Sequence, residues 1–207
     1  MSAPRLVLAS RNAGKVAELA RILADCGLAV ELVGVDAFDN VPEVAETGRT
    51  FEANALLKAH AVAAATALPS VADDSGLQVD ALNGMPGVLS ARWSGRHGDD
   101  AGNLQLVLGQ LEDVPDGRRG AAFHCAAALA LPNGSQWVAH GHWTGHLVRA
   151  PRGSNGFGYD PIFVPDGHTR TSAEMAPQDK DAESHRARAL HALAPIVAEL
   201  VAAGRLS

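Results

Sequence analysis

The sequence predicts an α/β fold with a mixed sheet and flanking helices, and two observations lead to this prediction. Along the first half of the chain, short apolar runs alternate with amphipathic segments, which is typical of strand–helix units. In the second half, the apolar segments Ala121–Leu131 and Gln136–Val148 flank Pro132-Asn133-Gly134-Ser135, a strong hairpin turn signal. Strand–helix units favour parallel pairing and a hairpin is antiparallel, so the sheet is expected to be mixed.

The first strand–helix unit begins with the apolar run Arg5–Ala9, which suits a buried strand. A helix follows Lys15 and stops at Gly27, a residue that commonly ends helices. Its apolar residues recur at the spacing of one helix face, at Val16, Leu19, Ala20 and Leu23. A second strand is expected over Ala29–Val35.

A polar, acidic loop over Phe38–Gly48 precedes the second helix, which Thr50 can cap and which is expected to run to about Thr66. A short strand over Ser70–Asp73 comes next. The following segment, Ser75–Asp99, is rich in glycine and contains two turn signals.

A helix over Asp100–Leu111 precedes the hairpin, and a loop over Pro151–Pro161 follows it. The last helix is expected to start near Ser184 and to be kinked or restarted at Pro195. With 207 residues, 47% of them hydrophobic, the chain suits one domain over residues 1–207.

Composition excludes several classes of function. A net charge of −6 and an aromatic content of 4% disfavour a protein that binds DNA or RNA polymers, which needs basic and stacking residues. No apolar run reaches the roughly 20 residues that span a bilayer, and no leader pattern is present, so a cytoplasmic protein without membrane contact is expected. Cys26 and Cys125 lie far apart and are expected to be free thiols.

The segment Ser10-Arg11-Asn12-Ala13-Gly14-Lys15 lies between the first strand and the first helix. Backbone N–H groups at a helix start and the helix dipole favour an anion there, and Lys15 adds a positive charge for phosphate oxygens. An ordinary capped helix start explains the same residues about equally well.

The motif Asp73-Asp74-Ser75-Gly76 follows an apolar strand. Two adjacent carboxylates are costly to place together without a cation, and magnesium prefers a few carboxylates with phosphate oxygens and water. The alternative is an Asx-type turn. Asn54 and Lys58 share one helix face, and the acidic loop at Glu43-Val44-Ala45-Glu46 could bring further carboxylates near them.

In the loop Ser154-Asn155-Gly156-Phe157-Gly158-Tyr159-Asp160-Pro161, glycines flank two aromatic residues, so the backbone can approach a planar ligand while a ring stacks on it. Asp160 could accept hydrogen bonds from a base edge. A tight loop with packed aromatics is the alternative. Lys180, and His185 with Arg186 in the first turn of the last helix, place positive charge where the helix dipole disfavours it. That conflict indicates a bound anion.

These motifs together resemble the noncanonical purine nucleoside triphosphate pyrophosphatases, the inosine/xanthosine triphosphate pyrophosphatase family. The resemblance runs from about Leu6 to Leu193. It rests on LASRNAGKVAEL, TGRTFEANALLKA, ADDSGLQVDALNGMPGVLSARWSG, GFGYDPIF, AEM and SHRARAL, in the family's order. It implies a mixed twisted sheet with two lobes around a central nucleotide-binding cleft, a homodimer, Mg²⁺ as cofactor, and ITP, dITP and XTP as substrates.

Carried over by position, the resemblance makes Asp74 the catalytic base and a metal ligand. It assigns substrate binding to residues of the motifs above: Ser10, Arg11, Asn12, Ala13, Gly14, Lys15, Lys58, Ser75, Phe157, Gly158, Tyr159, Asp160, Lys180, His185 and Arg186. Many relatives carry two adjacent acids where this chain has Ala45-Glu46, so the second metal ligand is expected to be Glu46, with Glu43 as the alternative.

The expected reaction is hydrolysis of a nucleoside triphosphate to the monophosphate and pyrophosphate, with Asp74, aided by Asp73, deprotonating the attacking water. Two alternatives remain open at this point. One is a pyrophosphatase of other modified nucleotides, and the other is a protein that binds nucleotides without catalysis.

Overall fold

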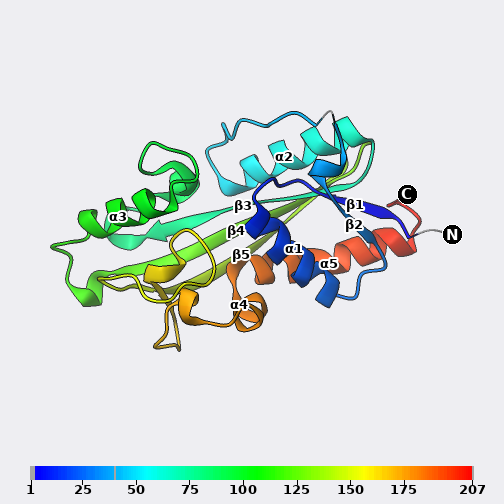
Figure 1. Ribbon diagram of the computed structural model, residues 1–207. Helices are drawn as coiled ribbons and strands as arrows, with labels where there is room; N and C mark the ends of the chain where they lie inside the picture. The colour runs from blue at the N-terminus through cyan, green and yellow to red at the C-terminus, as the bar shows by residue number, and fades with distance from the viewer. Residues whose placement is uncertain (1–2, 40, 207) are drawn as a thin grey trace. The chain divides into compact units, whose positions relative to one another are not determined.

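The computed structural model describes residues 3–39 and 41–206 of the 207-residue chain (Figure 1). The main elements are β1 (Arg5–Leu8), α1 (Ala13–Asp25), β2 (Glu31–Gly34), α2 (Phe51–Thr66), β3 (Ser70–Val79), α3 (Asp100–Gln110), β4 (Gly120–Ala130), β5 (Gln136–Leu147), β6 (Phe163–Pro165), α4 (Pro177–Glu183) and α5 (His185–Ala202). Short 3₁₀ helices lie at Val35–Ala37, Asp80–Leu82, Gly87–Arg92, Asp116–Arg118, Asp160–Ile162 and Ser172–Glu174.

The sheet has six strands in the order β2-β1-β3-β4-β5-β6 and is mixed, as the sequence predicts. β1 pairs in parallel with both β2 and β3, whereas β5 pairs antiparallel with β6. The predicted hairpin turn joins β4 to β5, and it is closed by the Leu131 N–H, which donates to the Ser135 carbonyl at 2.9 Å. The prediction of an α/β fold with a mixed sheet and flanking helices is therefore confirmed.

The chain divides into two compact units. The first unit contains residues 1–74, 125–141 and 186–207, and the second contains residues 75–124 and 142–185. In the first unit, α1 and α5 cover one face of the strands and α2 covers the other (Figure 1). The single domain with a central cleft, expected from the sequence, stays a prediction.

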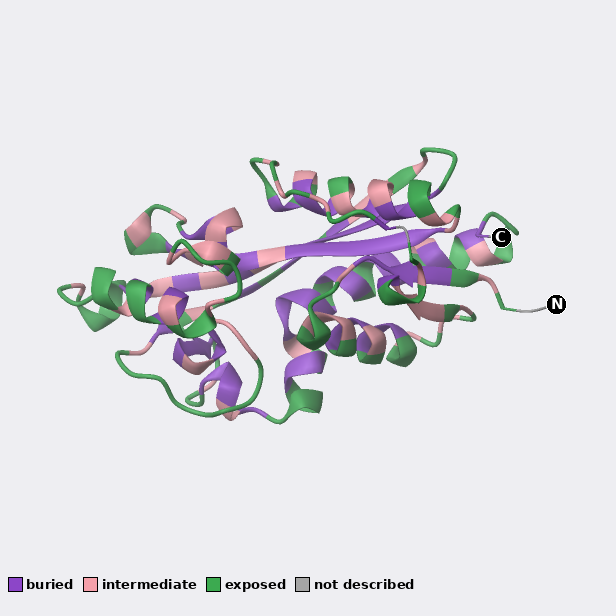
Figure 2. Cartoon of the chain, turned by 45° about the horizontal axis from the view of Figure 1, so that its top comes forward, coloured by how far each residue is buried: buried purple, intermediate pink, exposed green. Residues whose placement is uncertain are grey.

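Each unit has its own core, and Figure 2 shows that the strands are largely buried while loops and outer helix faces are exposed. In the first unit, Leu19 and Ile22 of α1 and Leu193 of α5 join a cluster that also includes Leu6 of β1 and Leu129 of β4. In the second unit, a separate cluster is built from Leu77, Val107, Trp143, Ile162 and Phe163, among others. Within the described ranges 3–39 and 41–206, no helix is both long enough and apolar enough to span a membrane.

One of the predicted strand ends is wrong, and one helix differs in part from the prediction. The strand expected over Ser70–Asp73 continues to Val79, so the acidic pair lies inside β3 rather than at its end. The final helix starts at His185, next to the predicted Ser184, and runs through Pro195 to Ala202 without a restart, while the kink expected as the alternative stays a prediction. Pro195 and His191 are both exposed, so water can satisfy the carbonyl that loses its helical partner. Two short elements, α4 and β6, were also not predicted.

Candidate active site

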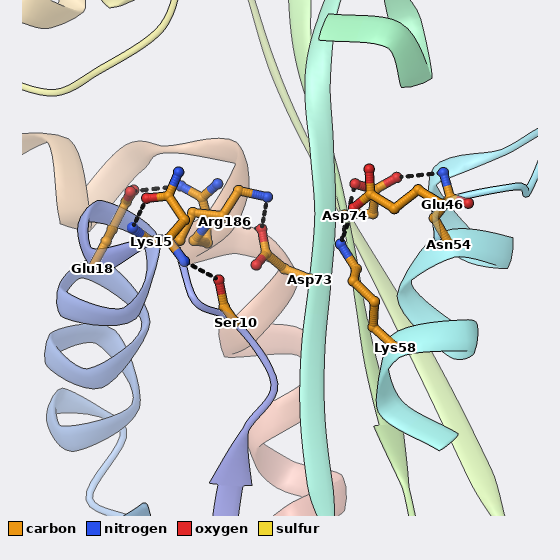
Figure 3. A network of polar contacts seen from close by, with 10 residues as sticks. Ser10, Lys15, Glu18, Glu46, Asn54, Lys58, Asp73, Asp74 and Arg186 are labelled. Atoms are coloured by element: carbon orange, nitrogen blue, oxygen red, sulfur yellow. Dashed lines mark hydrogen bonds and ion pairs between the residues drawn. The ribbon is translucent and has the colours of Figure 1, made fainter. Parts of the chain in front are cut away.

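The two carboxylates of the acidic pair lie on opposite faces of β3. Successive side chains of a strand point to opposite sides, and Figure 3 shows Asp73 turned toward Lys15 and Arg186, and Asp74 turned toward Lys58. Separate cations on each face therefore offset the free-energy cost of burying two adjacent carboxylates. Ser75, which follows along the strand, belongs to the second unit.

On the face covered by α1 and α5, Asp73 belongs to a buried ionic cluster with Lys15, Glu18 and Arg186. Its Oδ2 atom lies 3.2 Å from Lys15 Nζ and accepts a hydrogen bond from Arg186 Nε at 3.1 Å. Arg186 also donates from Nη1 to Glu18 Oε2 at 2.6 Å, and the side chains of Asp73, Glu18 and Arg186 are almost completely buried. Burial opposes the charge on Asp73, but Lys15 and Arg186 outweigh it and hold the pKa of this carboxyl well below its usual range.

On the face covered by α2, Asp74 is held by a neutral amide and a cation. Asn54 Nδ2 donates to Asp74 Oδ2 at 3.0 Å, and Lys58 Nζ lies 3.4 Å from Oδ1. The same ammonium donates to Glu46 Oε1 at 2.7 Å. Burial raises the pKa of Asp74, and the charge of Glu46 adds to this rise, despite the opposing effect of Lys58.

The Asp74 face offers the ligand types that a divalent cation prefers. The carboxylates of Asp74 and Glu46 both contact a single ammonium, so their oxygens converge on one position of positive charge. Carboxylate oxygens from one or two residues, completed by phosphate oxygens and water, are typical of magnesium sites. Within residues 3–39 and 41–206, no group of three or more His, Cys, Asp or Glu residues could hold a metal. The carboxylates of Asp74 and Glu46 fit a magnesium ion whose other ligands would be substrate oxygens and water.

Glu46 is an acidic-loop carboxylate that pairs with Lys58, at 2.7 Å, whereas Glu43 is exposed. The Ala45-Glu46 sequence thus still supplies one carboxylate to this face. Which of the two binds the metal stays a prediction.

The segment from Ser10 to Lys15 forms a capped helix start. Asn12 is the N-cap of α1, and its side-chain oxygen accepts the Lys15 N–H at 3.1 Å. Ser10 Oγ accepts the Asn12 N–H at 3.3 Å, and Ala13 and Gly14 begin the helix. The guanidinium of Arg11 donates to the Val41 carbonyl at 2.7 Å. These contacts fit both a capped helix start and an anion-binding segment. The cap uses only the backbone N–H of Lys15, and the ammonium of the same residue lies beside Asp73.

In the second unit, Asp160 holds the predicted base-binding loop together. Its Oδ2 atom accepts the Phe157 N–H at 3.0 Å and the Lys180 ammonium at 2.6 Å, while Ser172 Oγ donates to Oδ1 at 2.8 Å. Asp160 is 2% exposed. The Lys180 ammonium also lies 5.2 Å from the centre of the Phe157 ring, within cation–π distance.

The remaining loop residues are fixed by single contacts. Gly158 has a positive φ of 61°, which favours glycine, and its N–H donates to Asp100 Oδ2 at 2.8 Å. The Tyr159 hydroxyl donates to the Ser90 carbonyl at 2.9 Å. The buried His185 ring stacks on Phe123, with centroids 4.8 Å apart and an angle of 12° between the planes.

Glu18 and Ser172 contact predicted site residues, Arg186 and Asp160, and were not predicted themselves. Glu18 lies among the apolar residues of α1 and is 3% exposed, so an acidic residue within an apolar helix stripe was the available signal. Nothing in the pattern around Ser172 distinguishes it. The sequence places the positive charge of Arg186 at the start of α5, where the helix dipole disfavours it. In the structure, the carboxylates of Glu18 and Asp73 pair with this charge.

Comparisons with known proteins match nearly the whole chain. A family model described as the Ham1 family matches residues 6–196. A protein of Streptomyces coelicolor named dITP/XTP pyrophosphatase is 60% identical over 197 residues, covering 95% of this chain and 98% of the relative. A Ham1 protein structure from Coxiella burnetii has a TM-score of 0.85 and 46% identity, and covers 95% of this chain and 99% of that one. A Mycobacterium abscessus structure titled nucleoside-triphosphatase / dITP/XTP pyrophosphatase has a TM-score of 0.75 and 59% identity, with coverages of 92% and 99%.

Proposed function

Because the chain belongs to the Ham1 family, we propose that it hydrolyses noncanonical purine nucleoside triphosphates, such as ITP, dITP and XTP, to the monophosphate and pyrophosphate. The names of its relatives in Streptomyces coelicolor and Mycobacterium abscessus support dITP and XTP. The single observation that carries the proposal is the buried Asp74 carboxylate, held by Asn54 and Lys58 beside Glu46. A fixed carboxylate next to a shared cation position suits hydrolysis of a phosphoanhydride.

In this proposal Asp74 orients the attacking water and accepts its proton. A general base works best when its pKa approaches the working pH, and burial moves the pKa of Asp74 in that direction. Asp74 Oδ2 accepts a hydrogen bond from the Asn54 amide. The other oxygen, Oδ1, faces the Lys58 ammonium. Asp73 is assigned no part in the proton transfer, because its pairing with Lys15 and Arg186 holds its pKa low and makes it a poor base.

The phosphate groups are bound by cations and by helix-start amides of the first unit. Lys15 lies on one face of β3 and Lys58 on the other, so the Asp73-Asp74 segment is flanked by positive charge on both sides. The N–H groups at the start of α1 add donors that favour an anion. Positioning and charge stabilisation supply most of the catalysis in phosphoryl chemistry, and these residues provide both.

Magnesium is the proposed cofactor, held by Asp74 and Glu46. When bound, it would offset the charge that develops on the phosphate oxygens. We also propose a homodimer, on the basis of the family resemblance. A cytoplasmic setting is proposed as well, and the free thiols of Cys26 and Cys125 suit a reducing compartment.

Base recognition is proposed for the Phe157–Asp160 loop with Lys180 and His185 of the second unit. The Lys180 ammonium is a donor without acceptor capacity, so it can pair with the 6-keto oxygen of hypoxanthine or xanthine but not with the amino group of adenine. A polar mismatch of this kind can discriminate by ~10⁴ or more. Asp160 would act by holding Phe157 and Lys180 in place.

A panel of triphosphates tests the proposal directly. Purified protein is incubated with ITP, dITP, XTP, GTP, ATP and a modified pyrimidine triphosphate, with and without Mg²⁺, and pyrophosphate and monophosphate are measured separately. The expected result is equimolar pyrophosphate and monophosphate from ITP, dITP and XTP, only when Mg²⁺ is present, and no release from ATP, whose 6-amino group cannot accept a hydrogen bond from Lys180. Asp74→Asn should abolish this turnover, and Asp113→Asn, the same change at an exposed carboxylate, should leave it intact.

The other outcomes separate the rival functions. A preference for the modified pyrimidine would assign the chain to another class of modified nucleotide. Binding of intact ITP without product would indicate a nucleotide-binding protein that lacks catalysis. Release of orthophosphate instead of pyrophosphate would contradict cleavage between the α and β phosphates.

A further inference from the structure

The side chain of Asn54 connects the proposed catalytic carboxylate to Gly48, the last residue of the acidic loop. Asn54 lies in the second turn of α2 and is 0% exposed. Its Nδ2 atom donates to Asp74 Oδ2 at 3.0 Å, and its Oδ1 atom accepts the Gly48 N–H at 2.7 Å. One carboxamide therefore uses both of its ends, on two segments that are separate in the sequence.

We propose that Asn54 is a positioning residue for the reaction, which fixes the Asp74 carboxylate and the acidic loop in one geometry. This inference rests on the proposed function, because it assigns to Asp74 the role of base. Glu46, two residues before Gly48, is placed by the same loop and contacts Lys58 together with Asp74. A displacement of Asn54 would thus move both carboxylates that face the cation position.

The chemistry of the carboxamide suits this role. Burying an amide costs free energy unless both its N–H₂ and its oxygen are hydrogen-bonded. The side chain of Asn54 is therefore most stable in the orientation that makes both hydrogen bonds. Asparagine is also one of the less favourable residues within a helix, where it competes with the backbone for hydrogen bonds. Its presence inside α2 is explained by the two contacts rather than by helix propensity.

The residue type at position 48 agrees with this close contact between the loop and Asn54. A Cβ atom at position 48 would lie 2.6 Å from Asn54 Oδ1 and 2.8 Å from the Cβ atom of Ala53. Real Cβ atoms do not approach other atoms so closely. Glycine is required here for the close approach of the loop backbone to α2.

Two substitutions distinguish the hydrogen bond to Asp74 from the hydrogen bond to Gly48. Asn54→Asp keeps an oxygen for the Gly48 N–H but replaces the donor to Asp74 by a second carboxylate oxygen. Asn54→Ala removes both contacts. Thr50→Ala is the matched control, because it removes the N-cap contact to Ala53 from the same helix and touches neither Asp74 nor Gly48.

The experiment measures kcat and KM for ITP, hydrogen exchange of the Gly48 amide by NMR, and the melting temperature. For Asn54→Asp we expect kcat to fall by about 10²-fold with KM changed by less than about threefold, and Gly48 exchange to stay slow. For Asn54→Ala we expect a similar loss of kcat together with Gly48 exchange faster by about tenfold or more. Thr50→Ala should lower the melting temperature by roughly 2–4 °C and leave kcat and Gly48 exchange unchanged.

Three results would overturn the inference. The first is a kcat for Asn54→Asp within about threefold of the wild-type value. The second is slow Gly48 exchange in Asn54→Ala. The third is a loss of kcat in Thr50→Ala as large as in Asn54→Asp, which would reduce the effect to helix stability. Failure of the wild-type protein to release pyrophosphate would instead overturn the proposed function, while Gly48 exchange would still report the contact.

Discussion

Replacing Asp73 by Asn removes one charge from a buried cluster whose charges balance. Asp73 and Glu18 carry two negative charges, and Lys15 and Arg186 carry two positive ones. The Asp73→Asn substitution keeps the size and shape of the side chain and leaves one positive charge uncompensated. We expect this variant to lose stability rather than catalytic chemistry, because Asp73 faces away from Asp74.

The size of the effect follows from the contacts of Asp73. Its Oδ2 atom lies 3.2 Å from Lys15 Nζ and 3.1 Å from Arg186 Nε, and the side chain has no exposed surface. Each of these pairings is worth on the order of 5 kcal/mol before the cost of burying the charges is subtracted. Removing one partner of a buried pair costs about 3–5 kcal/mol, and Arg186 keeps its second partner, Glu18. A loss of about 3 kcal/mol is therefore expected, which lowers the melting temperature by roughly 6–12 °C.

Asp74→Asn is the matched variant, since it makes the same change at the next residue of the same strand. Burial and Glu46 raise the pKa of Asp74, so its charge contributes little to folding, and Lys58 keeps Glu46 as a partner. We expect its free energy of unfolding to stay within about 1 kcal/mol of the wild type while turnover of ITP is abolished.

Urea unfolding and pyrophosphate release, measured on both variants, check the pair of predictions. Asp73→Asn should retain measurable turnover at temperatures where it is folded. The reasoning is refuted if Asp73→Asn is as stable as the wild type but inactive, because Asp73 would then act in the chemistry. It is equally refuted if Asp74→Asn is destabilised as much as Asp73→Asn.

Three further predictions follow from single features of the structure. Burial raises the pKa of Cys125 to about 12, so about one Cys125 thiol in 10⁴ is ionised at pH 8. Mass spectrometry after alkylation should therefore find only Cys26 modified in the native protein and both cysteines modified in urea. Asp160→Asn should lower the free energy of unfolding by about 3 kcal/mol, because it leaves the buried Lys180 ammonium unpaired. The same variant should have a higher KM for ITP, and an unchanged midpoint of urea unfolding would contradict the prediction. Gly145→Ala should destabilise the protein by about 1–3 kcal/mol, because the added Cβ would overlap the backbone of β6, whereas Gly34→Ala, with open space around it, should be close to neutral in the same unfolding assay.

The elements that could be predicted are those whose signals are local. The strands β4 and β5 follow from two long apolar segments and a four-residue turn, and their bounds agree with the prediction to within one residue. The helix α2 follows from its Thr50 cap and ends at Thr66 as expected. β6 has three residues, too few to form a pattern, and was therefore missed. The seven residues of α4 are mostly polar, so no apolar spacing marks that helix.

The end of β3 could not be predicted, for an electrostatic reason. A strand that enters the core normally stops before two adjacent carboxylates, because each buried charge needs a partner. The partners of Asp73 come from α1 and from α5, and Arg186 is 113 residues away in the sequence. No local pattern can reveal a partner at that distance, so the prediction ended the strand at Asp73.

The alternation of side chains along a strand explains why the two carboxylates of the acidic pair have different partners. Once β3 continues through the pair, adjacent residues must face opposite sides of the sheet, whatever their chemical likeness. Asp73 then meets Lys15 and Arg186, and its charge is neutralised by them. Asp74 meets one amide and one ammonium, and burial works against its charge. The same residue type is thus a structural anion on one face and the proposed base on the other, and the difference comes from the partners that each helix supplies.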